Sequence, residues 1–129
     1  MIRPIPPTTD EVTFGYSHPL KTMFKKGKLP QVKLGFYGET LTKDTVTLEH
    51  LEPISKGGKT EFDNLVLANA DINNARGDKP LSDYINFQAM GEYLDQFRNL
   101  VIGKFNGNEY IKNIITKVGI ILNKEQGNV

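Results

Sequence analysis

Glu49 and His50 stand side by side in a pairing that suits hydrolytic chemistry. An unperturbed imidazole titrates near neutrality, so His50 can take a proton from water. A hard divalent cation prefers oxygen ligands, and Glu49 offers a carboxylate while Asn73 offers an amide oxygen. Water and a phosphate group can complete the shell of such an ion. These three residues are therefore the candidates for a metal ion held beside a general base.

The elements around these residues decide whether they meet. Residues 45–50 are β-branched and alternating, which predicts a strand, and residues 64–67 predict a second one. Residues 53–59 between them are typical of a turn-rich loop. A helix is expected over 69–76, with a glycine as its C-terminal stop. Adjacent strand residues normally face opposite ways, so Glu49 and His50 can share a site only at a strand end or a bend.

After Pro80, two amphipathic helices are expected. Ser82 is predicted to cap the first, and Asn108 the second, after a turn at residues 103–107. Apolar residues at steps of three and four give the first helix one face: Tyr84, Phe87, Met90, Leu94, Phe97 and Val101. The second helix has a similar face: Tyr110, Ile111, Ile114, Ile115, Val118 and Leu122.

Composition bounds the class of protein. The chain has 129 residues, of which 38% are hydrophobic and 24% charged, as in an ordinary globular domain. It contains no cysteine, which excludes disulfides, a thiol nucleophile and a cysteine-bound zinc. With no signal peptide and no apolar run of membrane length, we expect a cytoplasmic protein without membrane contact. The expected fold is α+β, one domain over 1–129 with a core at about 44–80 and a helical extension over 81–123.

The N-terminal part is locally basic. Between Val12 and Gly38 stand Lys21, Lys25, Lys26, Lys28 and Lys33, and no acid. Ser17 is predicted to cap a short helix over 18–26 in this region, and residues 32–37 to form a strand. A basic run in a chain of net charge +1 favours contact with a polyanion, although a solvated helix face explains it as well.

Residues 47–58, 63–67 and 73–78 together resemble the HNH endonuclease family. That family's motif is an acid or histidine followed by His, then Pro, a Gly-Gly turn, Asn-Leu and Asn-x-x-Lys/Arg-Gly. Here it reads Glu49-His50, Pro53, Gly57-Gly58, Asn64-Leu65 and Asn73-Asn74-Ala75-Arg76-Gly77. The resemblance covers about 35 residues and implies a ββα-metal (His-Me finger) core, flanked here by the basic N-terminal segment and two C-terminal helices.

The resemblance also implies roles. His50 would activate the attacking water, Asn64 would brace the loop that orients this base, and Glu49 and Asn73 would bind one Mg²⁺ or Mn²⁺ ion. The reaction would be hydrolysis of a phosphodiester in DNA, with RNA as an alternative, leaving a 5′-phosphate and a 3′-hydroxyl. Phosphate contacts are expected from Lys21, Lys25, Lys26, Lys28, Lys56, Lys59 and Arg76.

The sequence departs from the family pattern in three places. Glu49 stands where the acid is usually Asp, and Asn73 where the last ligand is usually His, which favours magnesium or manganese over zinc. Asn74 and Asp71 are neighbours that can substitute for Asn73. Residues 35–41, together with Asn69 and Ile72, stand where many members carry two cysteine pairs, so no structural zinc is expected and apolar packing must hold the core.

Two other interpretations stay open from the sequence. One is a nucleic-acid-binding protein that keeps this fold but cleaves little or nothing, because Glu49 replaces Asp. The other is a structural or inhibitor protein in which the motif arises by chance. The oligomeric state is equally open.

Overall fold

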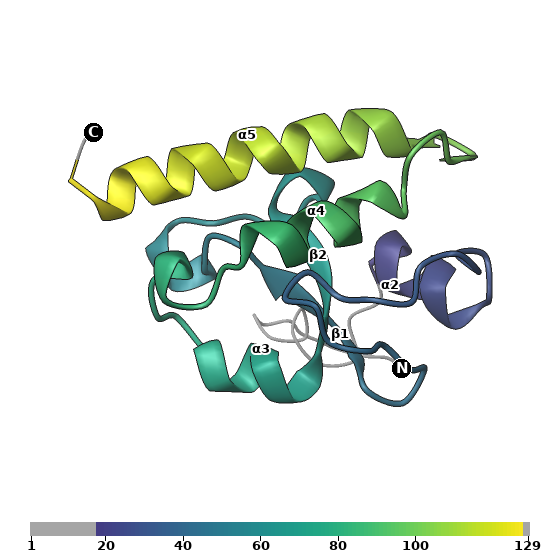
Figure 1. Cartoon of the computed structure of the whole chain (residues 1–129), viewed down its shortest axis with the longest axis horizontal. Helices are drawn as coiled ribbons and strands as arrows, with labels where there is room; N and C mark the ends of the chain where they lie inside the picture. The colour runs from purple at the N-terminus through teal and green to yellow at the C-terminus, as the bar shows by residue number, and fades with distance from the viewer. Residues whose placement is uncertain (1–17, 128–129) are drawn as a thin grey trace, which may run out of the picture.

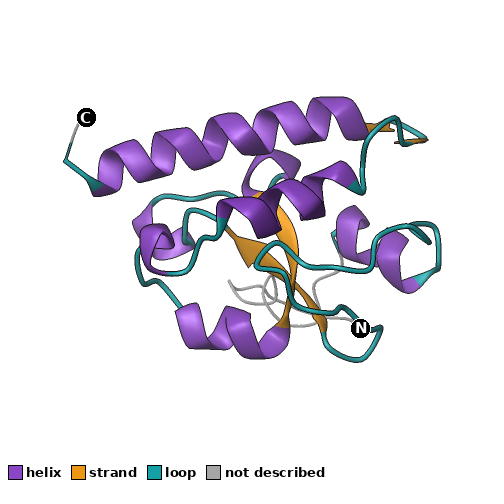
Figure 2. Ribbon diagram, viewed as in Figure 1, coloured by secondary structure: helices purple, strands orange, loops and turns teal. Residues whose placement is uncertain are grey.

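The computed structural model describes residues 18–127, which form an α+β fold as predicted. Two strands, β1 (Val46–His50) and β2 (Leu65–Asn69), lie at its centre, and four helices surround them (Figures 1 and 2). The helices are α2 (Pro19–Lys25), α3 (Ala70–Arg76), α4 (Phe87–Asp95) and α5 (Gly107–Glu125). A small hairpin of β3 (Val101–Ile102) and β4 (Phe105–Asn106) precedes α5, and single 3₁₀ turns occur at Ile54–Lys56, Phe62–Asn64 and Leu81–Asp83.

The central unit is an antiparallel strand pair followed directly by a helix. In its register Glu49 lies opposite Val66 and His50 opposite Leu65. The Asn69 side chain caps α3 by accepting a hydrogen bond from the Asp71 amide at 2.7 Å. Gly77 ends the helix at φ +54°, a conformation that favours glycine. Both predicted strands and the predicted helix of this region are therefore present, within one or two residues.

The C-terminal helices cover the opposite side of the strand pair from α3 (Figure 1). Residues 65–68 of β2 are fully buried. The Tyr110 hydroxyl of α5 donates to the Leu65 carbonyl at 2.7 Å, and the Tyr93 hydroxyl of α4 accepts from the Leu67 amide at 3.0 Å. Near its other end, α5 forms an ion pair between Lys124 and Glu52 at 2.6 Å. The helix thus contacts both β2 and the loop after β1.

The glutamate side chain of Glu39 ties the loop before β1 to the end of β2. Its Oε1 accepts a hydrogen bond from the Tyr37 amide at 3.0 Å, and its Oε2 accepts one from the Asn69 amide at 2.8 Å. A Cβ at Gly35 would lie 2.8 Å from Glu39 Cδ, so only glycine leaves room for this carboxylate. Tyr37 and Asn69 lie in the two segments where the family resemblance implies cysteine pairs in many members, and here one carboxylate joins these segments.

The prediction for the helix after Pro80 was wrong in its bounds. Ser82 lies in a 3₁₀ turn, and α4 begins later, where the Asn86 side chain accepts from the Ala89 amide at 3.0 Å. The Glu125 carboxylate accepts the Leu81 and Ser82 amides at 2.6 and 3.0 Å. The helix is correspondingly short, and two residues of its predicted apolar face, Phe87 and Val101, are exposed.

The last helix begins two residues before the prediction. Asn106, not Asn108, is its N-cap, and it accepts from the Glu109 amide at 3.0 Å. The β3–β4 hairpin occupies most of the predicted turn. Of the predicted face, Ile115 is exposed, whereas Ile121 is buried in its place among Tyr110, Ile114 and Val118.

Two N-terminal predictions also change. His18 is the N-cap of α2, its Nδ1 accepting from the Leu20 amide at 3.1 Å; Ser17, the predicted cap, lies outside the described residues. Residues 32–37 form only an isolated bridge, Leu34 with Thr40, because the Gln96 side chain bonds the backbone of residues 33 and 34. Across residues 18–127, every helix falls short of the length and apolar character that a bilayer crossing requires.

Candidate active site

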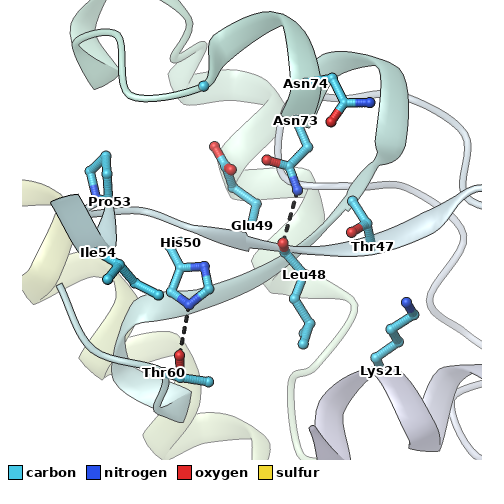
Figure 3. A pocket seen from close by; sticks show the side chains of 11 residues that line it. Lys21, Thr47, Leu48, Glu49, His50, Pro53, Ile54, Thr60, Asn73 and Asn74 are labelled. Carbon is cyan, nitrogen blue, oxygen red and sulfur yellow. Dashed lines mark hydrogen bonds between the residues drawn. The ribbon is translucent and has the colours of Figure 1, made fainter. Parts of the chain in front are cut away.

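A pocket of about 410 Å³ opens where β1, α3 and the loop after β1 meet (Figure 3). It is lined by Lys21, Thr47, Leu48, Glu49, His50, Pro53, Ile54, Thr60, Asn73, Asn74 and Gly77. Three of the four predicted metal-binding and catalytic residues therefore line one cavity. Glu49 and His50 both reach it because β1 ends at His50, so the alternation of strand side chains stops there.

Glu49 is 2% exposed and its two oxygens lie in different surroundings. Oε2 accepts hydrogen bonds from the Tyr37 hydroxyl at 2.6 Å and from Arg76 Nη1 at 2.9 Å. Oε1 accepts none from the protein within residues 18–127. Burial raises the pKa of Glu49, and the hydrogen bonds from Tyr37 and Arg76 oppose that shift. Burial raises the pKa of Tyr37 as well, and Glu49 adds to the shift, so the hydroxyl stays protonated and donates.

Asn73 presents its amide oxygen on the same side of the pocket as the Glu49 carboxylate (Figure 3). Its Nδ2 donates to the Leu48 carbonyl at 2.9 Å, which leaves Oδ1 turned toward the Glu49 carboxylate (Figure 3). Asn74 also lines the pocket, although a helix turns successive residues by about 100°. Asp71 does not line it.

The His50 imidazole is held at one nitrogen. Nε2 forms a hydrogen bond with the Thr60 hydroxyl at 2.9 Å, and Nδ1 has no protein partner in the described part of the chain. Burial lowers the pKa of His50 below 6.5. The ring is therefore neutral at pH 7, which is the form that accepts a proton.

Asn64 lies beneath the loop that carries Thr60. It is fully buried, and its Oδ1 accepts from the Glu52 amide at 2.8 Å while Nδ2 donates to the Glu52 and Lys59 carbonyls at 3.0 and 2.9 Å. Its amide thereby joins the two ends of the loop. The backbone is tight here, since a Cβ at Gly58 would lie 1.8 Å from the Glu52 carbonyl oxygen.

Arg76 differs from its expected role as a phosphate contact. It is 1% exposed, so its guanidinium has no surface to offer a nucleic acid. Besides Glu49 Oε2 it bonds three carbonyls: His50 at 3.1 Å, Leu51 at 2.9 Å and Lys79 at 2.9 Å. A buried guanidinium requires such partners, and here it connects α3 to the end of β1.

The donor set fits a hard cation with few protein ligands. Within residues 18–127, Glu49 Oε1 and Asn73 Oδ1 are oxygens without a protein hydrogen bond, and both residues line the pocket. Throughout residues 18–127 there is no group of three or more His, Cys, Asp and Glu side chains placed to hold a metal. An ion at this position would therefore take most of its ligands from water or substrate, as Mg²⁺ commonly does.

The family comparison matches the part of the chain that forms most of the pocket, from the loop before β1 to the residues after α3. Residues 38–79 match the HNH endonuclease family model. Comparison of the chain with curated proteins and with solved structures finds no significant match. The HNH segment, residues 38–79, contains Glu49, His50, Asn64 and Asn73. It includes all but the last residue of the core expected at about 44–80.

The predicted lysines lie in two places: on α2 and just after it, outside the HNH segment, and on the loop after β1, inside it. Lys21, on α2, lines the pocket although α2 is outside the segment. Lys56 and Lys59 are exposed on the loop after β1. Lys25, Lys26 and Lys28 are exposed at and after the end of α2.

Two residues that contact the site groups were not predicted from the sequence. Tyr37 precedes the HNH segment and bonds Glu49. Thr60 bonds His50 from ten positions along the chain. No sequence spacing predicts the contact of Tyr37 with Glu49. Thr60 could have been predicted, because it follows the Gly57-Gly58 turn that brings the loop back to β1.

Proposed function

We propose that this protein is a metal-dependent endonuclease that hydrolyses phosphodiester bonds in DNA. The family match indicates nuclease-type activity in general. The more specific proposal is carried by one observation: Glu49, Asn73 and His50 line the same pocket, and Glu49 Oε1, Asn73 Oδ1 and His50 Nδ1 make no protein hydrogen bond within residues 18–127. Two oxygens for a cation beside a neutral imidazole are what this hydrolysis needs.

The roles follow from the contacts. Glu49 and Asn73 would hold the ion, which when bound stabilises negative charge on the phosphate and on the leaving oxygen. His50 Nδ1 would take a proton from water while Nε2 donates to the Thr60 hydroxyl. The water oxygen bonds to phosphorus, the bond from phosphorus to the 3′ oxygen breaks, and that oxygen takes up a proton. The products are a 5′-phosphate and a 3′-hydroxyl.

The lysines support a nucleic acid as substrate. Lys21 at the pocket can meet the phosphate that is cut, and the exposed lysines of α2 and of the loop after β1 can contact phosphates on either side. Such contacts bind the backbone and carry no base sequence. DNA is favoured over RNA by the family resemblance.

The direct test is nicking of supercoiled plasmid with Mg²⁺ or Mn²⁺. We expect the wild type to convert plasmid to nicked circles, EDTA to stop the reaction, and His50→Ala to lose about 10²-fold or more of the rate. A wild type that nicks no faster than His50→Ala with either metal would refute the proposal. Asn73→Ala and Asn74→Ala make a matched pair, because only Asn73 is proposed as a ligand and only its variant should lose activity.

One observation favours a second candidate, a nucleic-acid-binding protein with little cleavage. Among residues 18–127, Glu49 supplies the only carboxylate that lines the pocket, and it is ion-paired with Arg76 at 2.9 Å, so its charge is already neutralised. In that case the wild type and His50→Ala would bind duplex DNA equally, with a salt-dependent affinity, and neither would nick it.

A further inference from the structure

The carboxylate of Glu49 is fixed through one of its oxygens only. Tyr37 and Arg76 both donate to Oε2, at 2.6 and 2.9 Å, and neither reaches Oε1. The final torsion of a glutamate side chain is broad, so without these donors the carboxylate can rotate and exchange its oxygens. Two donors on one oxygen set that rotation, and they leave the other oxygen of this pocket-lining residue unengaged by either donor.

Arg76 adds a second constraint on the same region. Its Nη1 donates to the His50 carbonyl as well as to Glu49, and its Nη2 donates to the Leu51 carbonyl. The guanidinium is planar and presents its donors in a rigid fork, so these acceptors are held in one relative geometry. One side chain therefore fixes the Glu49 carboxylate and the backbone that carries the His50 ring.

Tyr37 is itself held in place. Its ring packs edge-on against Phe36 and Tyr84, with centroids at 5.1 and 6.4 Å. The Tyr84 hydroxyl bonds the Ala75 carbonyl at 3.1 Å and does not contact Glu49. Tyr37 thus reaches Glu49 from an aromatic cluster, and it does so from outside the HNH segment.

We propose that Tyr37 and Arg76 are positioning residues that set the Glu49 carboxylate for cation binding, by holding Oε2 so that Oε1 faces the pocket. This inference rests on the proposed metal site. It assigns a role to one residue that the family match does not include, and it replaces the phosphate-contact role expected for Arg76. Hydrogen bonds of this kind, to a ligand rather than to the ion, commonly change metal affinity 10–100-fold.

The test is the affinity for Mn²⁺ alone, measured from the free-ion signal in electron paramagnetic resonance. Tyr37→Phe removes one hydroxyl from the cluster and keeps the ring. We expect its Mn²⁺ dissociation constant to rise about 10-fold. Tyr84→Phe is the matched control, because it removes a neighbouring hydroxyl that does not touch Glu49, and its dissociation constant should equal that of the wild type.

Arg76→Lys is the second variant. It keeps the positive charge beside Glu49 but cannot bond all of the same acceptors, so it separates geometry from charge. We expect weaker Mn²⁺ binding again. In plasmid nicking, both variants should need more Mn²⁺ for half-maximal rate while the KM for DNA stays the same, a split that a general loss of stability would not produce. Thermal unfolding of each variant checks that the protein is folded at the assay temperature.

The outcomes separate this inference from the proposed function. If the wild type binds Mn²⁺ and nicks DNA but Tyr37→Phe and Arg76→Lys bind Mn²⁺ as tightly as Tyr84→Phe, the positioning role is wrong and the nuclease proposal stands. If the wild type binds no Mn²⁺ and nicks nothing, the metal site is wrong and the positioning role falls with it. Weaker Mn²⁺ binding by both variants, with an unchanged control, supports it.

Discussion

Removing the Glu39 side chain should weaken the fold more than its half-exposed position suggests. Its carboxylate is the acceptor for the amides of Tyr37 and Asn69, at 3.0 and 2.8 Å. A hydrogen bond to a charged group contributes about 1.5–3 kcal/mol, and water can replace part of this at a half-exposed position. We therefore expect Glu39→Ala to lower the free energy of unfolding by about 2 kcal/mol.

Calorimetry or urea unfolding measures this loss. For a chain of 129 residues, 2 kcal/mol corresponds to a fall in Tm of about 8 °C. Glu61→Ala is the control, because Glu61 is exposed and its side chain makes no hydrogen bond or ion pair within the described residues. If Glu39→Ala and Glu61→Ala melt within about 1 °C of each other, the carboxylate does not tie the two segments together.

Gly35 allows an independent check on the same contact. Gly35→Ala places a methyl group 2.8 Å from Glu39 Cδ, so it should displace the carboxylate and destabilise the protein. In the double variant with Glu39→Ala the clash is gone, and stability should fall no further than in Glu39→Ala alone. Additive losses would show that the two residues act separately, contrary to the geometry.

Four further predictions concern the site. The rate of nicking should rise with pH to a plateau whose midpoint lies below pH 6.5, because burial lowers the pKa of His50 and only the neutral ring accepts a proton. Thr60→Val should lower kcat about 10-fold at unchanged KM, measured by plasmid nicking, because His50 Nε2 loses its partner. Gly58→Ala should cost about 3 kcal/mol or more in urea unfolding, since its Cβ would overlap a carbonyl. Replacing Lys25 and Lys26 by Gln should reduce the salt slope of DNA binding by about 2, measured by fluorescence anisotropy.

The part of the fold that the sequence predicts is the part determined locally. The alternation of residues 45–50 marks β1, and Asn69 with Gly77 marks the two ends of α3 within ten residues. By contrast, Ser82 and Asn86 are both good caps, and local pattern cannot choose between them. The choice falls to Asn86 because the Glu125 carboxylate, more than forty residues away, binds the amides at 81 and 82.

The same distinction applies to the candidate site. Glu49, His50 and Asn73 are identified by residue type and order, and they do line one pocket. Arg76 was misjudged because arginine is normally exposed, and because three of its four acceptors lie more than twenty residues earlier in the chain. Tyr37 was missed for the same reason: its contact with Glu49 depends on how the loop before β1 folds back against the strand pair, which no local spacing encodes.

The contacts of α4 and α5 with the buried strand β2 have a consequence for engineering. Residues 38–79 are about as short as an independent fold can be without a disulfide or a structural metal, and the buried run 65–68 is covered by α4 and α5, which lie outside that stretch. Cut free, it would expose an apolar strand and aggregate. The HNH segment should therefore not be transferred alone into another protein. Any chimaera built from this protein must include the C-terminal helices as well.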